Sequence, residues 1–87
     1  MNSNFDKLMK EISVFEKQTG FDKTPKKELV NRLKEEVKDY EKTEFKDIRE
    51  NKLMDIIVLV IQLSIRENIY LDKAWIKWFK KSEKYLS

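Results

Sequence analysis

A single glycine and a single proline in 87 residues are the strongest constraint on what this chain can fold into. Turn-rich β folds depend on both residue types, because glycine supplies positive φ angles and proline presets the geometry of turns. Charged residues make up 40% of the chain, a proportion that suits long amphipathic helices. A chain of this length also has room for only one domain. The sequence therefore predicts a single all-α domain over residues 1–87.

The first predicted helix is amphipathic and has recognisable ends. Apolar residues recur at helical spacing from Phe5 until Gly20, which supplies a left-handed cap, and Ser3 with Asp6 resembles a capping box. This helix is therefore expected over about residues 4–19.

The second predicted helix begins where Thr24 precedes Pro25, a pairing typical of an N-cap with proline at the first helical position. Its apolar stripe passes through Leu33 and Val37, and it ends near Lys42.

The third predicted helix runs from Phe45 or Lys46 to Glu67, and Asn68 is expected to end it. Between Leu53 and Ile65 it is apolar almost all round, which is the pattern of a helix surrounded by others. This stretch is 13 residues long, well short of the roughly 20 that cross a bilayer. We therefore expect a buried helix and no membrane span.

The fourth predicted helix, capped by Asp72, has an aromatic side and a lysine side. The net charge of +3 arises in this part of the chain, which could face phosphate. Trp75 and Trp78 lie on the aromatic side, where core or dimer packing is a better explanation than stacking on a base.

Asp55 is the most informative polar residue of the third helix. An unpaired carboxylate inside an apolar helix is costly, so we expect a cation close to it. Asn51, Gln62 and Arg66 fall on the same line of the helix and extend a polar seam. Two interpretations stay open: a structural network in which Lys52, Arg66 or another lysine pairs with Asp55, and a metal site.

Acidic residues on the second helix favour the metal site. Glu36 and Asp39 lie three residues apart at the edge of the apolar stripe, and Glu35 points nearer the solvent. Opposed by Asp55, they can supply the oxygen ligands that Mg²⁺ prefers. The sequence has no cysteine and no histidine, so thiolate and imidazole chemistry is excluded.

The order of these residues resembles the MazG-like all-α nucleoside triphosphate pyrophosphohydrolases, in which an EExxE helix is followed by an ExxD helix. The resemblance rests on segments 33–39 and 52–57, continues through 68–72, and covers roughly residues 26–85. It implies a four-helix MazG-like bundle, completed by dimerisation because so short a chain leaves apolar surface uncovered.

The sequence differs from the two family motifs at one important position. Glu35 and Glu36 match the paired glutamates, Asp39 stands for the third, and Asp55 matches the aspartate of ExxD. Lys52 stands where the glutamate of ExxD is expected, and its charge would oppose a metal ion.

Two arrangements of this lysine stay open. Lys52 could swing outward and leave the amide oxygen of Asn51 as a neutral ligand, or it could replace the metal's charge by pairing with Asp55.

The resemblance implies hydrolysis of a (deoxy)nucleoside triphosphate to the monophosphate and pyrophosphate, with Mg²⁺ or Mn²⁺ as cofactor. The residues implied are Glu35, Glu36, Asp39 and Asp55 for catalysis, Glu36, Asp39, Asp55 and Asn51 for the metal, and Lys52, Lys77, Lys80, Lys81 and Lys84 for the substrate.

Two other functions remain open. Lys52 favours a catalytically degenerate relative that binds a nucleotide or a protein partner, and the lysines of the fourth helix allow a small nucleic-acid-binding protein, which is less favoured. The lack of a basic-then-apolar leader, together with the lack of cysteine, predicts a cytoplasmic protein, and we expect a homodimer.

Overall fold

The computed structural model describes residues 4–86, and every regular element in that range is a helix. The elements are α1 (Phe5–Thr19), the short 3₁₀-helix η1 (Phe21–Lys23), α2 (Lys26–Lys42), α3 (Lys46–Glu67), α4 (Leu71–Ser82) and the 3₁₀-helix η2 (Glu83–Tyr85). The prediction of an all-α fold with four α-helices is confirmed for the described range. No helix within it is both long enough and apolar enough to cross a membrane.

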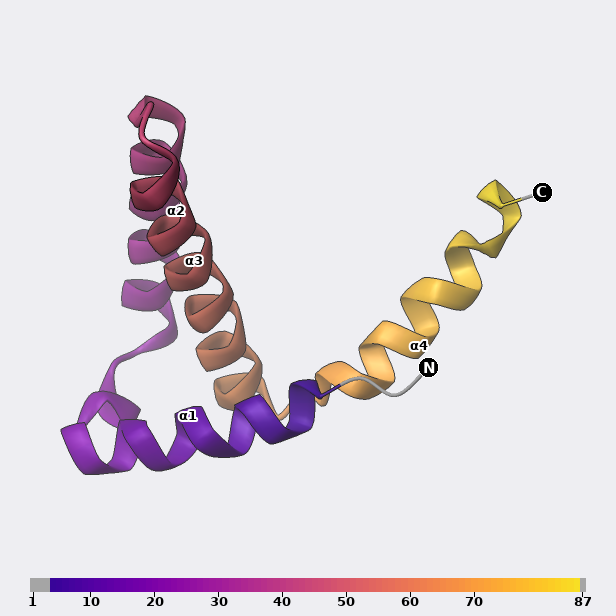
Figure 1. Ribbon diagram of the computed structural model, residues 1–87. Helices are drawn as coiled ribbons and strands as arrows, with labels where there is room; N and C mark the ends of the chain where they lie inside the picture. Colours follow the sequence, from indigo (N-terminus) through magenta and orange to yellow (C-terminus); the bar gives the residue numbers. More distant parts are fainter. Residues whose placement is uncertain (1–3, 87) are drawn as a thin grey trace.

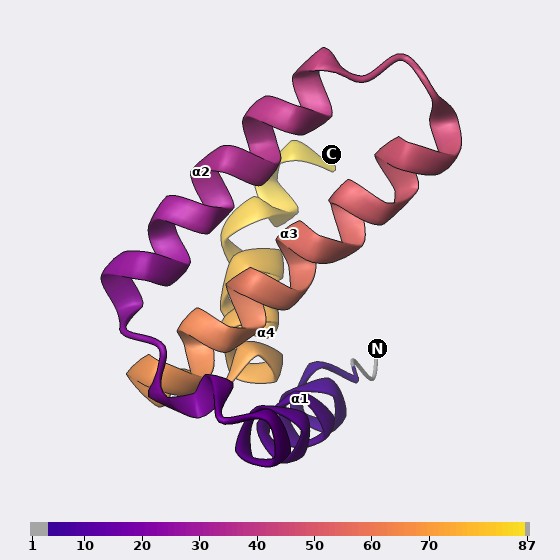
Figure 2. The ribbon, with the colours of Figure 1, turned by 90° about the vertical axis from the view of Figure 1, so that its left-hand side faces the viewer.

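The helices form an open V rather than a closed bundle (Figure 1). α2 and α3 pack against each other as an antiparallel hairpin, and α1 crosses the base of that hairpin (Figure 2). α4 leaves the same base beside the start of α1 and diverges from the hairpin. The Cα radius of gyration is accordingly 14.8 Å, whereas a compact domain of this length has about 12 Å.

Two helix ends lie where the sequence places them. Gly20 ends α1 with φ of 82° and Asn68 ends α3 with φ of 55°, both in the left-handed region. Glycine and asparagine are the residues that visit this region at least cost. The second helix starts one residue later than predicted, since Pro25 is the N-cap and Lys26 the first helical residue. Ser3, which was expected to cap α1, lies outside the described residues.

Asp72 caps a different helix from the one predicted. α4 begins at Leu71, so Asp72 lies within its first turn, and its carboxylate accepts hydrogen bonds from the backbone N–H groups of Phe5 (3.1 Å) and Asp6 (3.3 Å). The first amides of α1 have no partner within their own helix, and the side chain of Asn4 does not cap them. Asp72 therefore fastens the start of α4 to the start of α1.

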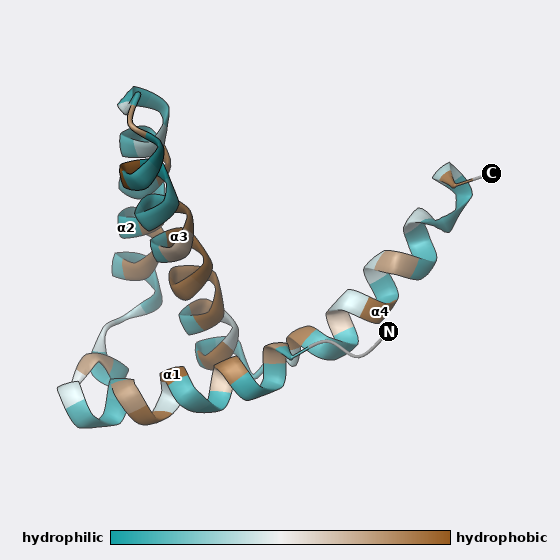
Figure 3. Ribbon diagram, viewed as in Figure 1, coloured by the Kyte–Doolittle hydropathy of each residue, from teal (hydrophilic) through white to brown (hydrophobic). Residues whose placement is uncertain are grey.

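The core is small. Among apolar residues only Leu29, Leu59 and Ile61 are classed as buried in the described range. The prediction that the apolar part of α3 is surrounded is wrong for the single chain, because α2 covers one side, α1 covers the end, and α4 points away. Figure 3 shows that the middle of α3 is hydrophobic, while its end near α2's C-terminus is hydrophilic. The residues left more than 40% exposed on this helix include Leu53, Met54, Ile57 and Val60.

Candidate functional site

Lys52 joins the two helices of the hairpin. Its Nζ lies 3.2 Å from Oε2 of Glu36 and 3.5 Å from Oδ2 of Asp39. Glu36 and Asp39 are three residues apart on α2, so both face α3 from one side. The hydrogen bond to Glu36, made to Oε1 at 3.5 Å, is the main cause that raises the pKa of Lys52, and the charge of Glu36 and the contact with Asp39 add to it. The ammonium group of Lys52 therefore lies between the carboxylates of Glu36 and Asp39, and the side chain does not point outward.

Asp55, one turn further along α3, is exposed and has no hydrogen bond or ion pair within residues 4–86. The premise of the prediction that a cation lies close to it, burial of Asp55 in an apolar helix, is therefore wrong for the single chain, and no side-chain cation pairs with it in the described range. The physical reason is the open side of α3: a carboxylate that keeps its water needs no partner. Lys52 and Arg66, the partners considered for Asp55, bind other carboxylates.

A pocket of about 280 Å³ lies where α2 and α3 meet the end of α1 and η1. It collects three of the four carboxylates that the sequence singles out: Glu35, Glu36 and Asp55. Asp39 reaches them only through the shared contact with Lys52. The remaining residues that line the pocket are Phe15, Phe21, Arg32, Val58, Leu59 and Gln62.

The predicted metal ligands do not form a cation cage in this conformation. Across residues 4–86, no three acidic side chains come together closely enough to hold a metal ion. Lys52 supplies the positive charge between Glu36 and Asp39, and Asn51 is exposed on α3. A metal ion could therefore bind Glu36 and Asp39 only after it displaces Lys52 from them.

The predicted substrate lysines of the C-terminal part lie on the other arm of the V. All are exposed on α4 or η2, which diverges from the hairpin that carries the carboxylates (Figure 1). They are Lys77, Lys80, Lys81 and Lys84. Within one chain, the acidic and basic parts of the expected site are therefore separated.

The tryptophans of α4 pack on each other rather than in the core. The rings of Trp75 and Trp78 are stacked, with centroids 5.4 Å apart and planes inclined by 17°, and Phe79 lies 6.0 Å from Trp75. Trp78 is half exposed. This side of α4 is available for packing against another surface.

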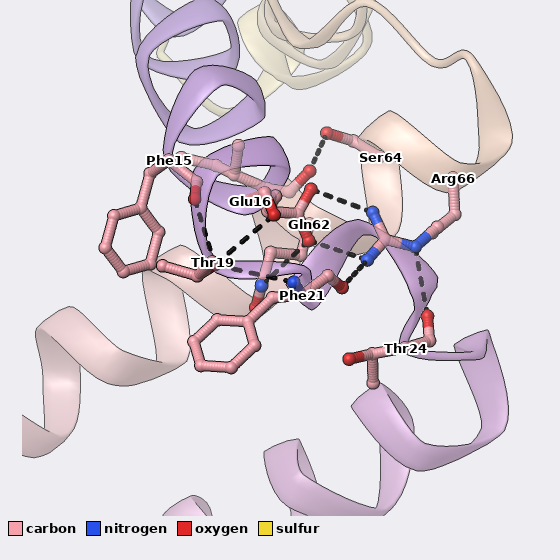
Figure 4. A network of polar contacts seen from close by, with 9 residues as sticks. Phe15, Glu16, Thr19, Phe21, Thr24, Gln62, Ser64 and Arg66 are labelled. Carbon is pink, nitrogen blue, oxygen red and sulfur yellow. Dashed lines mark hydrogen bonds and ion pairs between the residues drawn. The ribbon is translucent and has the colours of Figure 1, made fainter.

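A buried polar network, which the sequence analysis missed, holds α1 to α3 (Figure 4). Glu16 is only 1% exposed and accepts hydrogen bonds from Arg66 at 2.9 and 2.6 Å and from the side-chain amide of Gln62 at 3.0 Å. Arg66 also donates to the backbone oxygens of Phe21 (2.8 Å) and Thr24 (3.1 Å). Its hydrogen bond to Glu16 raises the pKa of Arg66, so the guanidinium group stays charged.

A signal for this network was present in the sequence. Glu16 follows Ile12 by four residues and Met9 by seven, so it continues the apolar stripe of α1. Gln62 and Arg66 were correctly placed on one line of α3, but their partner is Glu16 and not Asp55. A charged residue on an apolar stripe is the feature that could have identified the pair.

No family model matches this chain, and comparison with curated proteins and with solved structures gave no match either. The class of protein is therefore defined by the fold and the site alone. In the described range it is an all-α protein with a lysine-bridged carboxylate pair on a helical hairpin.

Proposed function

We propose that the protein is a MazG-like domain that binds a nucleotide without hydrolysing it. The observation that carries this proposal is Lys52, whose ammonium group bridges Glu36 and Asp39 where a catalytic metal ion would need both carboxylates. In pyrophosphohydrolases of this type, the metal grips the triphosphate and activates the attacking water. Without the metal ion, a site of this kind can still bind the nucleotide but lacks the group that activates the attacking water.

Electrostatics supports this assignment. Two like charges about 4 Å apart repel by about 4 kcal/mol at an effective dielectric near 20, and a divalent ion doubles that figure. A metal ion therefore has to displace Lys52 from Glu36 and Asp39 before it can bind them. The raised pKa of Lys52 also means that the lysine does not become neutral near pH 7.

We propose in addition that the protein works as a homodimer. The accessible surface of the chain is 7272 Å², whereas a compact chain of 10.6 kDa exposes about 5,500 Å². The excess is about 1,800 Å² per chain, a typical share for one partner of an obligate dimer. Ile57 and Val60 on α3 and Trp78 on α4 belong to the apolar surface that a second copy would cover.

A dimer of this kind would also bring the two parts of the site together. The lysines of α4 diverge from the carboxylates of their own hairpin, so the partner's α4 is the better source of positive charge for a bound phosphate chain (Figure 1). Lys80 and Lys84 are our candidates for this contact. The absence of cysteine suits a reducing compartment, and we assign the protein to the cytoplasm.

A second candidate function is hydrolysis itself, and one observation favours it. Glu35, Glu36 and Asp55 line one pocket, and neither Glu35 nor Asp55 has a hydrogen bond or ion pair within residues 4–86. If a metal ion displaced Lys52, these carboxylates could take part in its ligand set. Hydrolysis would then require a high concentration of Mg²⁺ or Mn²⁺.

Pyrophosphate release from the eight common nucleoside triphosphates, measured with Mg²⁺ and with Mn²⁺, separates the two candidates. Our proposal expects no turnover by the wild type, together with binding of at least one nucleotide in calorimetry. Lys52→Glu should introduce metal affinity, while Lys52→Met tests removal of the charge alone. Turnover by the wild type that is lost in Asp55→Asn would establish hydrolysis and overturn our proposal.

A further inference from the structure

We infer that the pocket between Phe15, Phe21, Glu35, Asp55 and Gln62 binds a small, flat organic cation of the amidinium or guanidinium class. The inference rests on three independent features of the pocket: a fixed acceptor in its wall, a surplus of negative charge, and aromatic sides. The pocket shares Glu35, Glu36 and Asp55 with the proposed nucleotide site. The inference does not rest on that proposal, because it involves no phosphate and no metal ion.

The fixed acceptor is the side-chain carbonyl of Gln62. This residue is only 7% exposed and lines the pocket. Its Nε2 donates to Oε2 of Glu16 at 3.0 Å, and a carboxylate can only accept, so the orientation of the amide is settled. The carbonyl oxygen has no hydrogen-bond partner in the part of the chain that the structure describes. Because Gln62 lines the pocket and this oxygen is unpartnered, it is available to a ligand that carries a hydrogen-bond donor.

The pocket has a net negative charge after the side chains that form ion pairs within the chain are left out of the count. Arg32 binds Glu28 at 2.8 Å, and the charge of Glu36 is met by Lys52. Glu35 and Asp55 remain, and neither has an ion-pair partner among the described residues. Since both are carboxylates, the pocket of the single chain favours a cation over an anion of the same shape.

The sides of the pocket suit a flat ligand. Phe15 and Phe21 pack edge to face with centroids 6.0 Å apart, and Val58 and Leu59 add apolar surface. The faces of aromatic rings attract cations, and Phe15 and Phe21, which are 52% and 44% exposed, leave ring surface open to a ligand. A volume of about 280 Å³ is room for about nine water molecules, which is enough for a ring that carries an amidinium group.

The test is a ¹H–¹⁵N NMR titration of the full-length wild type with benzamidine hydrochloride at pH 7. We expect shifts of the Gln62 side-chain amide and of the Phe15 and Phe21 signals, with a Kd of about 1 mM for so small a probe. Benzamide, which is neutral, and benzoate, which is an anion of the same shape, should bind much more weakly or not at all.

A double variant tests the two carboxylates. Glu35→Gln with Asp55→Asn should weaken benzamidine binding by about tenfold or more, because the charge-assisted contacts are removed. The matched control is Glu44→Gln with Asp47→Asn, which changes the net charge equally at exposed residues outside the pocket. It should leave the affinity unchanged.

Three outcomes would overturn the inference. They are benzoate binding as tightly as benzamidine, no shift of the Gln62 side-chain amide at about 10 mM benzamidine, and equal affinity in the two double variants. The comparison of probes uses only the wild type, so it decides the question even if a variant fails to fold. The nucleotide assay plays no part in any of these readouts.

Discussion

Glu16 of α1 and Arg66 of α3 form a two-point ion pair that is shielded from water. The two guanidinium nitrogens lie 2.9 and 2.6 Å from the two carboxylate oxygens, and the side chains are 1% and 14% exposed. Because Arg66 also binds the backbone of η1 and the residue after it, one side chain holds α1, η1 and the start of α2 at the base of the hairpin. The pair thereby sets the position of the phenylalanines that border the pocket.

Removing one partner of this pair should be strongly destabilising. Arg66→Met leaves the buried carboxylate of Glu16 without its cation, and we expect a loss of about 3 to 5 kcal/mol in the free energy of unfolding. Urea denaturation followed by circular dichroism measures this loss. The double variant Glu16→Leu/Arg66→Met should recover a large part of it, since no buried charge remains. A loss below about 1 kcal/mol in the single variant would contradict the burial of the pair.

The Lys52 bridge should make stability depend on alkaline pH. Its pKa in the folded chain is raised above the ordinary value of 10.5. The stabilisation is therefore complete below about pH 10.5 and is lost as the pH rises through the folded pKa. Thermal melts between about pH 8 and 11.5 should show a steeper fall in Tm for the wild type than for Lys52→Met.

Other lysines and the tyrosines titrate in the same range, so the comparison needs a matched control. Lys46→Met removes an exposed lysine that has no ion pair among the described residues. It should retain the steep fall of the wild type. Equal pH profiles for Lys52→Met and the wild type would mean that the bridge contributes nothing in solution.

Asp55→Asn should leave the stability of the metal-free protein nearly unchanged. The side chain is exposed and has no partner in the described range, and surface substitutions of this kind stay within about 0.5 kcal/mol. Chemical denaturation beside Asp47→Asn, an exposed aspartate on the same helix, measures the difference. A loss of about 3 to 5 kcal/mol would show that Asp55 is a buried ion-pair partner after all.

If the protein is a dimer, a charge placed on the apolar face of α3 should dissociate it. Sedimentation of the wild type at micromolar concentration should give twice the monomer mass of 10.6 kDa. Ile57→Lys, at a position 43% exposed, should shift the protein to monomer because burying an unpaired ammonium group in an interface is costly. Val14→Lys, at a position 55% exposed on α1, is the control and should leave the dimer intact. A wild type that sediments as a monomer at every concentration tested would refute the dimer.

Most of the secondary structure could be predicted because local chemistry decides it. Gly20 and Asn68 end helices in the left-handed conformation, which few other residues adopt at low cost. The bounds of α1, α2 and α3 came within one or two residues of those observed, since apolar periodicity and caps act over only a few positions. For α4 they did not: the pattern predicted a helix that includes Tyr85 and Leu86, whereas α4 ends at Ser82 and a 3₁₀-helix follows. The grouping of Glu36 and Asp39 near Lys52 also follows from helical spacing and from the antiparallel hairpin.

The partners of the charged residues were harder to predict from the sequence. A helical wheel gives the direction in which a side chain points, but not which residue of another helix lies there. Arg66 could have bound Asp55 on its own helix, yet Glu16 on α1 takes it. Asp72 could have capped α4, yet the free amides at the start of α1 lie closer to it. Each choice depends on contacts between residues more than forty positions apart.

The sequence by itself determined that this protein is built from helices, where most of those helices begin and end, and that Glu36 and Asp39 share a face of α2. Only the tertiary structure decided which charges are buried and which are solvated. Asp55 sits on a helix that is apolar almost all round, but α4 diverges and leaves that side open to water, whereas Glu16 is enclosed where α1 crosses α3. The physical reason is that the cost of a charge depends on the water that its neighbours remove, and those neighbours come from distant parts of the chain.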